Sequence, residues 1–442
     1  MYKAYRSLKT WNRQHKIRAH CLLLLQDYAG GEMLIDEIKS TGQETLYDEI
    51  KNFARTTENL HSIMKLLFIN YEYPPIGAGA ANATYQIGKN MVCFGHDVYV
   101  LTSCFKSLKG WSIEDGVKVF RCKTMRKKAS RSNIFEMFLF VASAFFVLPC
   151  LLKRKKIEAM IVFFSFPCGP LGLWGKLAAN VPYVISLRGG DVPGNETSLN
   201  IIHKILKPLR QLVFKNSHAI IANSKGLKTL SEKSDLFPVK VIPNGVDTDF
   251  FTPVNETSSK WHFLFVGRFQ DQKNLFFLLE QMDAAACKLR EKFELHMVGD
   301  GPAIYALKTY ANKLTIKDNI FWHGWCDKKQ LKYYYQQADC LLNLSLYEGM
   351  PNVILEAMAS GLPVIASNVM GNDEVVRHGE TGVLINLNQP EEFIKIVCKL
   401  IQNKKLAKAM GQKARQLMEK AFSWDRVANE YILLLRKNEN TI

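Results

Sequence analysis

Short apolar runs alternate with longer amphipathic stretches from Met64 onward, and this alternation predicts the fold. Strand-like runs occupy residues 66–70, 97–102, 117–121, 159–164, 183–187, 219–222 and 239–242. Helices are predicted between them, for example over residues 80–93, 171–179 and 201–214. Strands that are apolar along their whole length are typical of a parallel sheet covered by helices on both faces.

A second series of the same kind begins at residues 263–267. Its further strands are predicted at residues 294–298, 320–322, 340–344, 364–366 and 383–385, and the last helix at 424–435. The turn residues Pro243-Asn244-Gly245 and the polar stretch 253–260 separate the two series. The sequence therefore predicts an α/β protein with two doubly wound, Rossmann-like parallel-sheet domains, 64–255 and 256–422, that face a cleft. We expect the closing segment, 423–442, to form a helix that packs back on the first domain.

Residues 1–63 differ from the rest of the chain. They are polar and of mixed charge, with short helical stretches and no strand pattern. We expect a helical N-terminal extension of accessory function, or a translation start assigned upstream of the true one at Met64. The apolar run Leu22–Leu25 is too short for the core of a signal peptide, which favours a cytoplasmic location.

Composition places the chain among globular proteins and gives it a strong positive charge. The 442 residues are 48% hydrophobic and 22% charged, with a formal net charge of +17. Such a charge predicts an affinity for anions, which include nucleic acid, acidic lipid head groups and phosphorylated substrates. Ten scattered cysteines without a C-x-x-C pair are typical of reduced thiols in a cytosolic protein.

One segment combines basic and apolar residues. Residues 121–133 carry six cations and no acid, residues 134–152 are almost wholly apolar, and Lys153-Arg-Lys-Lys156 follows. The apolar stretch is long enough to span a bilayer, but Glu136, Pro149 and its position between two strands of one sheet argue against a span. We predict a helix that lies on an anionic membrane surface; a buried helix beside a solvated basic loop is the alternative.

Candidate ligand-binding residues of the first domain follow two of its strands. Gly77 and Gly79 lie between the first strand and a helix, where backbone N–H groups can hold a phosphate, although a plain turn also explains them. Arg188, Gly190 and Asp191 lie on a glycine-rich loop where a later strand meets the cleft. A salt bridge or a turn-forming aspartate is the alternative there.

In the second domain, Gly267, Arg268 and Lys273 follow the first strand. A guanidinium fork and a lysine on one loop can neutralise a diphosphate. Gly301 lies in another glycine turn into a helix. Backbone groups after Gly324, beside Trp325, are candidates for contact with the edge of a nucleobase.

Residues 346–361 contain two carboxylates eight positions apart. We expect Glu348 in a loop and Glu356 about one turn inside the helix that follows. The helix start offers N–H groups and a positive dipole end to an anion, with a carboxylate on each side to bind hydroxyls. The backbone of this anion site is expected to comprise Gly349, Met350, Pro351 and Asn352. A capped helix with two solvated glutamates is the alternative.

Together these motifs resemble those of the retaining glycosyltransferases of the GT-B class, family four. The resemblance covers about residues 64–435 and is strongest in the C-terminal half. It rests on Glu348-x7-Glu356, Gly-Arg…Lys at 267–273, Val-Gly-Asp-Gly-Pro at 298–302, Pro-Asn-Gly-Val-Asp at 243–247 and Gly-x-x-Glu-x-Val at 371–376. It implies a nucleotide sugar on the second domain and an acceptor on the first.

The resemblance also implies roles for individual residues. Arg268 and Lys273 would bind the diphosphate, Glu356 the ribose and Glu348 the transferred sugar, while Gly79 would approach the diphosphate from across the cleft. No cofactor and no metal are implied, and the chain has no Asp-x-Asp motif. Many members carry a histidine where this chain has Arg188, which stays protonated and cannot serve as a base. Asp191 then becomes the candidate for orienting the acceptor.

We therefore expect a retaining hexosyltransferase that moves a sugar from a nucleotide diphosphate to a hydroxyl of a glycan or lipid-linked glycan. It would act in polysaccharide or lipopolysaccharide biosynthesis, as a peripheral protein on the inner face of the cytoplasmic membrane. A catalytically inactive, membrane-associated nucleotide-sugar-binding protein is the alternative. Nucleic-acid binding is not expected, because the cations cluster beside an apolar helix and are not interleaved with aromatic residues.

Overall fold

The computed structural model describes residues 63–436 except 78, 127–131, 196–198, 255–259 and 290–292. The chain divides into two units, Met1–Ile63 and Met64–Ile442. The predicted N-terminal extension lies outside the described residues apart from Ile63, as do the boundary predicted at 255/256 and three of the six cations in the basic segment.

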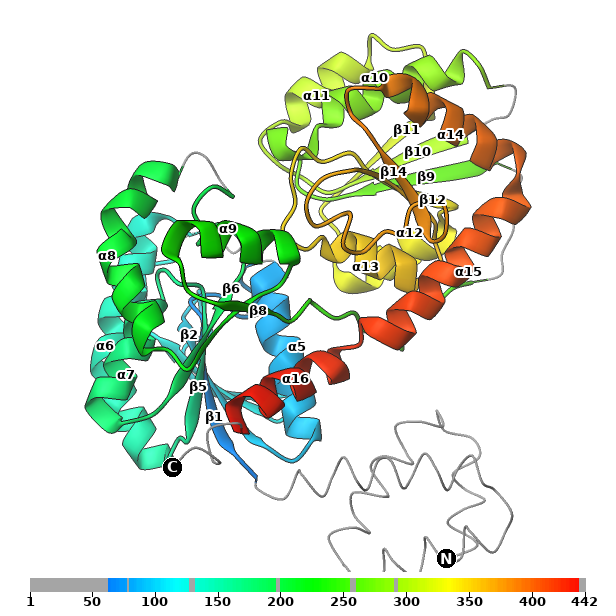
Figure 1. The fold of residues 1–442 in the computed structure, drawn as a ribbon. Coiled ribbons are helices and arrows are strands. Elements are labelled where there is room, and N and C mark those ends of the chain that lie inside the picture. The colour runs from blue at the N-terminus through cyan, green and yellow to red at the C-terminus, as the bar shows by residue number, and fades with distance from the viewer. Residues whose placement is uncertain are drawn as a thin grey trace, which may run out of the picture. The chain divides into compact units, whose positions relative to one another are not determined.

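The first sheet has the strand order β3-β4-β2-β1-β5-β6-β7-β8 (Figure 1). Its strands are β1 Lys65–Ile69, β2 Asp97–Ser103, β3 Gly110–Glu114, β4 Val117–Cys122, β5 Ala159–Phe163, β6 Tyr183–Leu187, β7 Ala219–Ala222 and β8 Val239–Val241. All neighbours are parallel except β3 and β4. Phe68 of the central strand β1 lies opposite Val100 of β2 and Ile161 of β5. The predicted parallel sheet is confirmed.

Helices cover both faces of this sheet. The helices of this region are α5 Gly79–Cys93, α6 Ile134–Lys155, α7 Gly169–Ala179, α8 Asn200–Asn216 and α9 Lys225–Asp235. Side chains of α6, α7, α8 and α9 share one core with the sheet. Side chains of α5 share the core of the opposite face with those of α16, Trp424–Arg436. The burial of both faces explains why these strands are apolar along their length.

Strand β3 was missed by the sequence analysis. It is an antiparallel edge strand on which Trp111 and Ile113 remain exposed, so it lacks the apolar run that marks the buried strands. Asp115 and Gly116 connect it to β4 with φ of 48° and 82°. Positive φ at both positions is the requirement of a type I′ hairpin turn, for which Asp-Gly is a strong sequence signal.

Helix α6 is a crossover helix of the first domain. Asn133 and Glu136 form a reciprocal capping box at its start, with Asn133 as the N-cap residue and Glu136 in the first turn. Phe140, Ala144 and Leu148 are buried against the sheet. Among the described helices, α6 alone is long and apolar enough to cross a membrane by length and composition. It connects β4 to β5, and its buried side chains pack on the sheet and against α7, which argues against a membrane span.

The second sheet has the order β11-β10-β9-β12-β13-β14, and every neighbouring pair is parallel. Its strands are β9 Trp261–Val266, β10 Phe293–Val298, β11 Ile320–Gly324, β12 Cys340–Asn343, β13 Val364–Ser367 and β14 Gly382–Ile385. The helices are α10 Leu275–Ala286, α11 Ile304–Ala311, α12 Lys328–Gln337, α13 Asn352–Ala359, α14 Pro390–Gln402 and α15 Lys404–Ala421. Helices α10, α11 and α14 pack on one face and α12 and α13 on the other, while side chains of α15 belong to both cores.

The chain passes between the two sheets twice, and the two passages are bonded to each other. After β8 it crosses toward the second sheet, where the Val246 N–H donates to the Phe422 carbonyl oxygen at 2.7 Å. It returns between α15 and α16. Helix α16 contacts α5, and its Tyr431 hydroxyl lies 2.7 Å from Ser186 Oγ on β6. The last described helix is therefore part of the first domain's packing (Figure 1).

Candidate active site

The start of α13 is the centre of the candidate site. The helix begins at Asn352, with Pro351 as its N-cap residue and no side-chain cap. The sequence predicted this arrangement, with Glu348 in the preceding loop and Glu356 inside the helix. A Cβ added to Gly349 would meet no atom within 4 Å, so the loop backbone faces open space. Uncapped N–H groups beside an open loop suit an anion.

Glu348 is held in place by two side chains. Its Oε1 lies 2.5 Å from Lys273 Nζ and 2.7 Å from the Ser345 hydroxyl. Oε2 has no hydrogen-bond partner in the described part of the chain. Glu348 is only 6% exposed, so the orientation of its carboxylate is fixed, while Oε2 remains for a ligand hydroxyl.

Arg268 and Lys273 lie on the loop after β9, but their surroundings differ. Lys273 ends the short 3-10 helix Asp271–Lys273 and is committed to Glu348. Arg268 is exposed, and within the described ranges it makes no ion pair. The site therefore carries one cation paired to a carboxylate and one that makes no ion pair with a described residue.

Two of the predicted glycines explain how loops pack, and one faces open space. A Cβ at Gly301 would lie 2.4 Å from the Phe269 carbonyl oxygen, so the glycine lets its loop lie against the loop after β9. Gly267 donates its N–H to Val298 in the same contact between the loops. Gly324 has φ of 69° and open space around its Cα, and the neighbouring Trp325 is 77% exposed.

Glu356 lies one turn inside α13 and accepts a hydrogen bond of 2.9 Å from the Tyr335 hydroxyl. Burial raises the pKa of this carboxyl to about 7, while the Tyr335 hydrogen bond and Lys328 lower it. The side chain lines a small pocket with Asn82 and Gln86 of α5. This pocket is therefore lined by residues of both domains beside α13.

Gly79 lies opposite the start of α13. A Cβ added there would approach Asn352 Nδ2 to 3.1 Å, so a larger residue would push against the helix start. This places the glycine turn of the first domain against the anion site of the second. Ala78, between the two glycines of that turn, is outside the described residues.

A chain of side-chain hydrogen bonds connects the predicted acceptor loop to α13. Arg188 Nη1 donates to Asn244 Oδ1 at 2.7 Å, and Asn244 Nδ2 donates to Asn352 Oδ1 at 2.9 Å. Arg188 also contacts the Tyr431 hydroxyl at 3.2 Å and lies over the Phe163 ring. Burial lowers its pKa, and no ion pair to a described carboxylate compensates its charge.

The Asp191 carboxylate accepts backbone hydrogen bonds from its own loop and from the loop after β5. Its Oδ1 accepts the N–H groups of Arg188 at 2.9 Å and Gly189 at 3.0 Å, and its Oδ2 accepts that of Ser165 at 2.6 Å. Gly190, beside it, contacts the His203 ring through its carbonyl oxygen at 3.2 Å. Both carboxylate oxygens of Asp191 therefore accept hydrogen bonds from backbone N–H groups. This geometry favours the alternative of a turn-forming aspartate.

Sequence reasoning missed several residues of this site. Asn244 belongs to the Pro-Asn-Gly-Val-Asp motif at 243–247 but was assigned no role, yet it hydrogen-bonds to residues of both domains. Glu374, in the 371–376 motif, accepts the N–H groups of Lys225 and Gly226 at the start of α9 at 2.6 and 2.9 Å. Tyr335 and Tyr431 carried no sequence signal, because one tyrosine in a helix is not distinguishable from a core residue.

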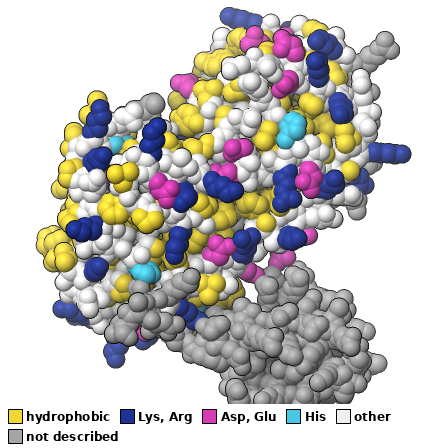
Figure 2. Space-filling view, viewed as in Figure 1, with side chains coloured by type: hydrophobic (Ala, Val, Ile, Leu, Met, Phe, Trp, Pro, Cys, Tyr) yellow, Lys and Arg dark blue, Asp and Glu magenta, His cyan; other side chains and the backbone are white. Residues whose placement is uncertain are grey.

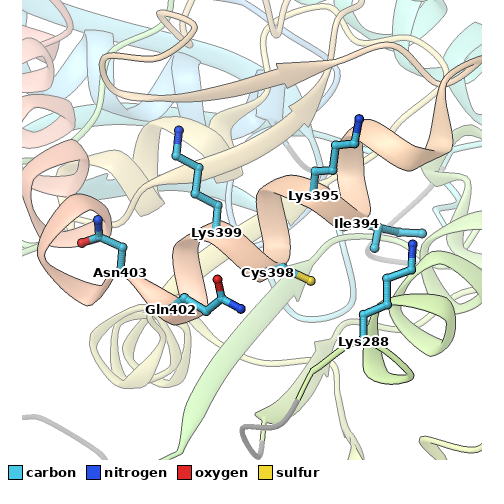
Figure 3. Close-up of a pocket in the computed structure, with 7 residues that line it drawn as sticks. All are labelled: Lys288, Ile394, Lys395, Cys398, Lys399, Gln402 and Asn403. Carbon is cyan, nitrogen blue, oxygen red and sulfur yellow. The ribbon is translucent and has the colours of Figure 1, made fainter.

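A separate hollow of about 590 Å3 lies on the other face of the second sheet (Figure 3). It is lined by Lys288 and by residues of α14 and its end, including Lys395, Lys399 and Asn403. No residue of the first domain lines it. The hollow is therefore distinct from the site at α13.

The sequence matches two family profiles that divide at the crossing between the sheets. Residues 77–250 match Glycosyltransferase Family 4, and residues 247–417 match Glycosyl transferases group 1. The chain is 30% identical over 58% of its length to the Escherichia coli UDP-Gal:alpha-D-GlcNAc-diphosphoundecaprenol alpha-1,3-galactosyltransferase, covering 69% of that protein. It is 25% identical over 84% of its length to an uncharacterised glycosyltransferase of Methanocaldococcus jannaschii, covering 97% of it.

Solved structures share the fold at lower identity. Sucrose-phosphate synthase of Thermosynechococcus elongatus superposes with a TM-score of 0.74 at 19% identity, over 86% of this chain and all of that one. Anabaena HepE in complex with UDP and glucose gives 0.66 at 17% identity, again over 86% of this chain and all of that one. The predicted GT-B architecture is confirmed, and the chain belongs to the glycosyltransferases of family 4 and group 1.

Proposed function

We propose that this glycosyltransferase is a retaining enzyme that moves a hexose from a nucleoside diphosphate sugar to a hydroxyl of a lipid-linked glycan. The observation that carries the proposal is the Lys273–Glu348 pair beside the uncapped start of α13. Cationic side chains and free N–H groups there can stabilise a departing diphosphate, and the carboxylate can bind hydroxyls of the sugar.

In this proposal, residues of the site are assigned to each part of the nucleotide sugar. Arg268 and Lys273 neutralise the diphosphate together with the N–H groups of the 349–352 loop. Glu348 offers Oε2 to the sugar, and Glu356 binds ribose hydroxyls from inside the helix. Trp325 and the backbone after Gly324 lie beyond β11, where they can contact the base. The Anabaena structure holds UDP, and the name of the Escherichia coli relative includes UDP-Gal, so a uridine donor is the first to test.

The reaction that fits these residues needs no carboxylate base on the acceptor side. The bond from the anomeric carbon to the phosphate oxygen breaks while the acceptor oxygen bonds to the same face of that carbon. The acceptor proton passes to the departing phosphate oxygen. Asp191 is saturated by backbone N–H groups, and Arg188 remains protonated, so neither serves as the base.

A lipid-linked acceptor agrees with the apolar surface of the first domain. Phe138 and Phe146 of α6 are 66% and 80% exposed, and Ile201 and Ile205 of α8 are also exposed. Figure 2 shows hydrophobic side chains gathered along this edge, at the left of the view, with lysines and arginines among them. We propose that α6 and α8 dock on an anionic membrane surface. The enzyme would then act at the cytoplasmic face, where nucleotide sugars are available.

The relatives favour the same acceptor class. The Escherichia coli relative is named for a diphosphoundecaprenol acceptor, and a Rhizobium meliloti relative, 24% identical over 52% of this chain, is named for lipopolysaccharide core biosynthesis. We propose a step of polysaccharide or lipopolysaccharide assembly on this basis. No metal cofactor is required in this scheme, because Arg268, Lys273 and the helix start supply the positive charge.

A thermal-shift panel of UDP-, GDP- and ADP-sugars tests the donor, because a ligand of the folded state raises the melting temperature. We expect one nucleotide class to stabilise the full-length protein. Turnover is then followed with that donor and a polyprenyl-diphosphate glycan, with and without EDTA, and the anomeric configuration of the product is determined by NMR. An inverted product, binding without turnover, or activity lost to EDTA and restored by Mg2+ would each contradict the corresponding part.

A further inference from the structure

Three imidazoles and a carboxylate form a row across one face of the second sheet. His262 lies on β9, Glu294 and His296 lie on β10, and His323 lies on the edge strand β11. The parallel register places His262 directly beside Glu294. Because alternate residues of a strand share a face, Glu294 and His296 project to the same side. The proposed transfer reaction uses none of these side chains.

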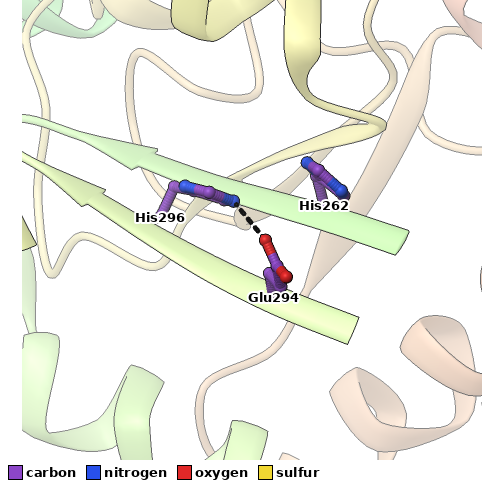
Figure 4. Close-up of side chains that lie close together, drawn as sticks. All are labelled: His262, Glu294 and His296. Carbon is purple, nitrogen blue, oxygen red and sulfur yellow. Dashed lines mark ion pairs between the residues drawn. The ribbon is translucent and has the colours of Figure 1, made fainter. Parts of the chain in front are cut away.

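The first three of these residues converge on one point. One ligand atom from each of His262, Glu294 and His296 lies within 4.8 Å of the other two. His296 Nε2 and Glu294 Oε2 are 3.4 Å apart and face each other (Figure 4). Beyond this ion pair, His296 Nε2 is buried and makes no hydrogen bond with the described residues, while Glu294 Oε1 accepts a hydrogen bond of 2.6 Å from Lys260. The ring nitrogen and the second carboxylate oxygen thus point into the same space.

The other ring nitrogen of His296 is within hydrogen-bond distance of a second histidine. His296 Nδ1 lies 2.9 Å from His323 Nε2, and the two rings are parallel within 9°. A histidine that binds a metal through one nitrogen ordinarily donates its other N–H to a fixed partner, which sets the ring's orientation. The backbone of His262 donates its N–H to Asp339 Oδ2 at 2.8 Å, and the His262 ring stacks on that of His296 with the ring centroids 5.3 Å apart.

We propose that His262, Glu294 and His296 bind a divalent transition-metal ion of the zinc class. Two imidazoles and one carboxylate are a set that zinc accepts with a fourth position left to water, whereas magnesium and calcium prefer oxygen ligands. The Glu294 and His296 side chains are 17% and 18% exposed, so the site lies close to the surface while the ligand atom of His296 is buried. Bonds of about 2.0–2.1 Å require donors about 3.3 Å apart, which side-chain rotation on adjacent strands can supply.

The metal also fixes the protons of two rings. With His296 bound through Nε2, its proton lies on Nδ1 and is donated to His323 Nε2, so the proton of neutral His323 lies on Nδ1. His323 immediately precedes Gly324 and Trp325. The ion would thereby order the strand end from which the exposed Trp325 loop begins, without contacting the donor.

Cobalt binding tests this site independently of transfer. The full-length protein is stripped with EDTA, dialysed and titrated with Co2+ while its visible spectrum is recorded. We expect one equivalent whose spectrum lacks a thiolate charge-transfer band and which Zn2+ displaces. His296→Ala and the isosteric Glu294→Gln should each weaken its binding by at least about tenfold, in line with loss of a metal ligand.

Matched controls are His378→Ala and Glu280→Gln, both at exposed positions outside the cluster. They should bind cobalt as the unchanged protein does. Equal affinity in the cluster variants, or a thiolate band that shows cysteine ligands, would overturn the proposal. If His296→Ala does not fold, Glu294→Gln still decides the question, because it keeps the shape of the side chain.

Discussion

Lys273 Nζ lies 2.5 Å from Glu348 Oε1, and this contact joins the loop after β9 to the loop that feeds α13. Both side chains are largely buried, at 14% and 8% exposure, so neither is free to change its partner by swinging into solvent. The lysine is therefore held close to where a diphosphate would bind, while Glu348 keeps Oε2 for the sugar. This arrangement makes the two residues a single functional unit.

Glu348→Gln should lower transfer by roughly 100-fold or more, which corresponds to about 2.7 kcal/mol in the barrier. The amide keeps the shape of the side chain but removes the charge that orients Lys273 and accepts sugar hydroxyls. Initial rates at saturating acceptor measure the effect. The control is Glu391→Gln, at an exposed position of α14. Turnover near that of the unchanged enzyme would refute the role of Glu348.

Arg268→Ala should separate catalysis from stability. Arg268 is exposed and has no ion pair within the described ranges, so its loss should change the free energy of unfolding by no more than about 0.5 kcal/mol. Transfer should nevertheless fall by roughly 100-fold, since a cation on the leaving diphosphate is lost. Denaturant unfolding and steady-state kinetics are measured on the same preparation. A matched exposed arginine, changed as Arg377→Ala, should alter neither quantity.

Glu356 should make the stability of the unliganded protein depend on pH. Its pKa is raised to about 7 by burial, from an ordinary value of 4.5. The folded state therefore binds the proton more tightly than the unfolded state. The associated stability is fully present below pH 4.5 and is lost as the pH rises toward and through 7, by on the order of 3 kcal/mol at most.

Glu356→Gln should remove this contribution. Melting temperatures between pH 4.5 and 8 should fall less with rising pH in the variant than in the unchanged protein. Tyr335→Phe provides a second comparison, because its hydroxyl donates to the carboxylate and lowers the pKa. Loss of the Tyr335 hydroxyl should raise the pKa of Glu356 and so move the pH-dependent fall in melting temperature to higher pH. Identical pH profiles for the protein and Glu356→Gln would show that the carboxyl is not perturbed.

Arg188→Met should impair transfer without destabilising the fold. Burial lowers the pKa of the Arg188 guanidinium more than the nearby Tyr431 and Asp191 raise it, so this charge is costly to the folded state. Its replacement should leave the melting temperature unchanged or raise it. Transfer should fall because the Arg188–Asn244–Asn352 bonds orient the start of α13.

Asn244→Ala should show the same loss of transfer, and the double variant should lose little more. Such non-additivity is expected of residues in one hydrogen-bond chain. The measurement is a double-mutant cycle on kcat/KM, for which Arg188→Lys tests geometry, since an ammonium cannot reproduce the guanidinium fork. Fully additive losses would show that the two residues act separately.

Phe146→Ser should weaken binding to anionic vesicles by roughly tenfold or more, because burying an exposed aromatic side chain contributes about 1.5–3 kcal/mol. Flotation with vesicles of neutral and anionic lipid, at low and high salt, measures the effect. The control is Tyr305→Ser, since Tyr305 is an equally exposed aromatic residue on α11 of the second domain. Equal flotation of both variants would contradict docking through α6.

Much of the fold was available from the sequence because burial on both faces imposes a continuous apolar run on each strand. The predicted strands 183–187 and 219–222 coincide with β6 and β7, and the others differ by one or two residues at one or both ends. The exposed edge strand β3 has no such run and was missed. Its Asp115-Gly116 turn was the usable signal.

The sequence by itself determined the architecture, the family and the position of Glu348 and Glu356 relative to α13, because these depend on local periodicity and on motifs of fixed spacing. Only the tertiary structure decided which side chains meet. Lys273 pairs with Glu348 across 75 residues, and Asn244 bonds to Asn352 across 108. The tertiary structure also placed backbone N–H groups within hydrogen-bond distance of the Asp191 carboxylate and brought His262 beside Glu294. Contacts between residues distant along the chain arise from strand order and loop path, and no local pattern specifies them.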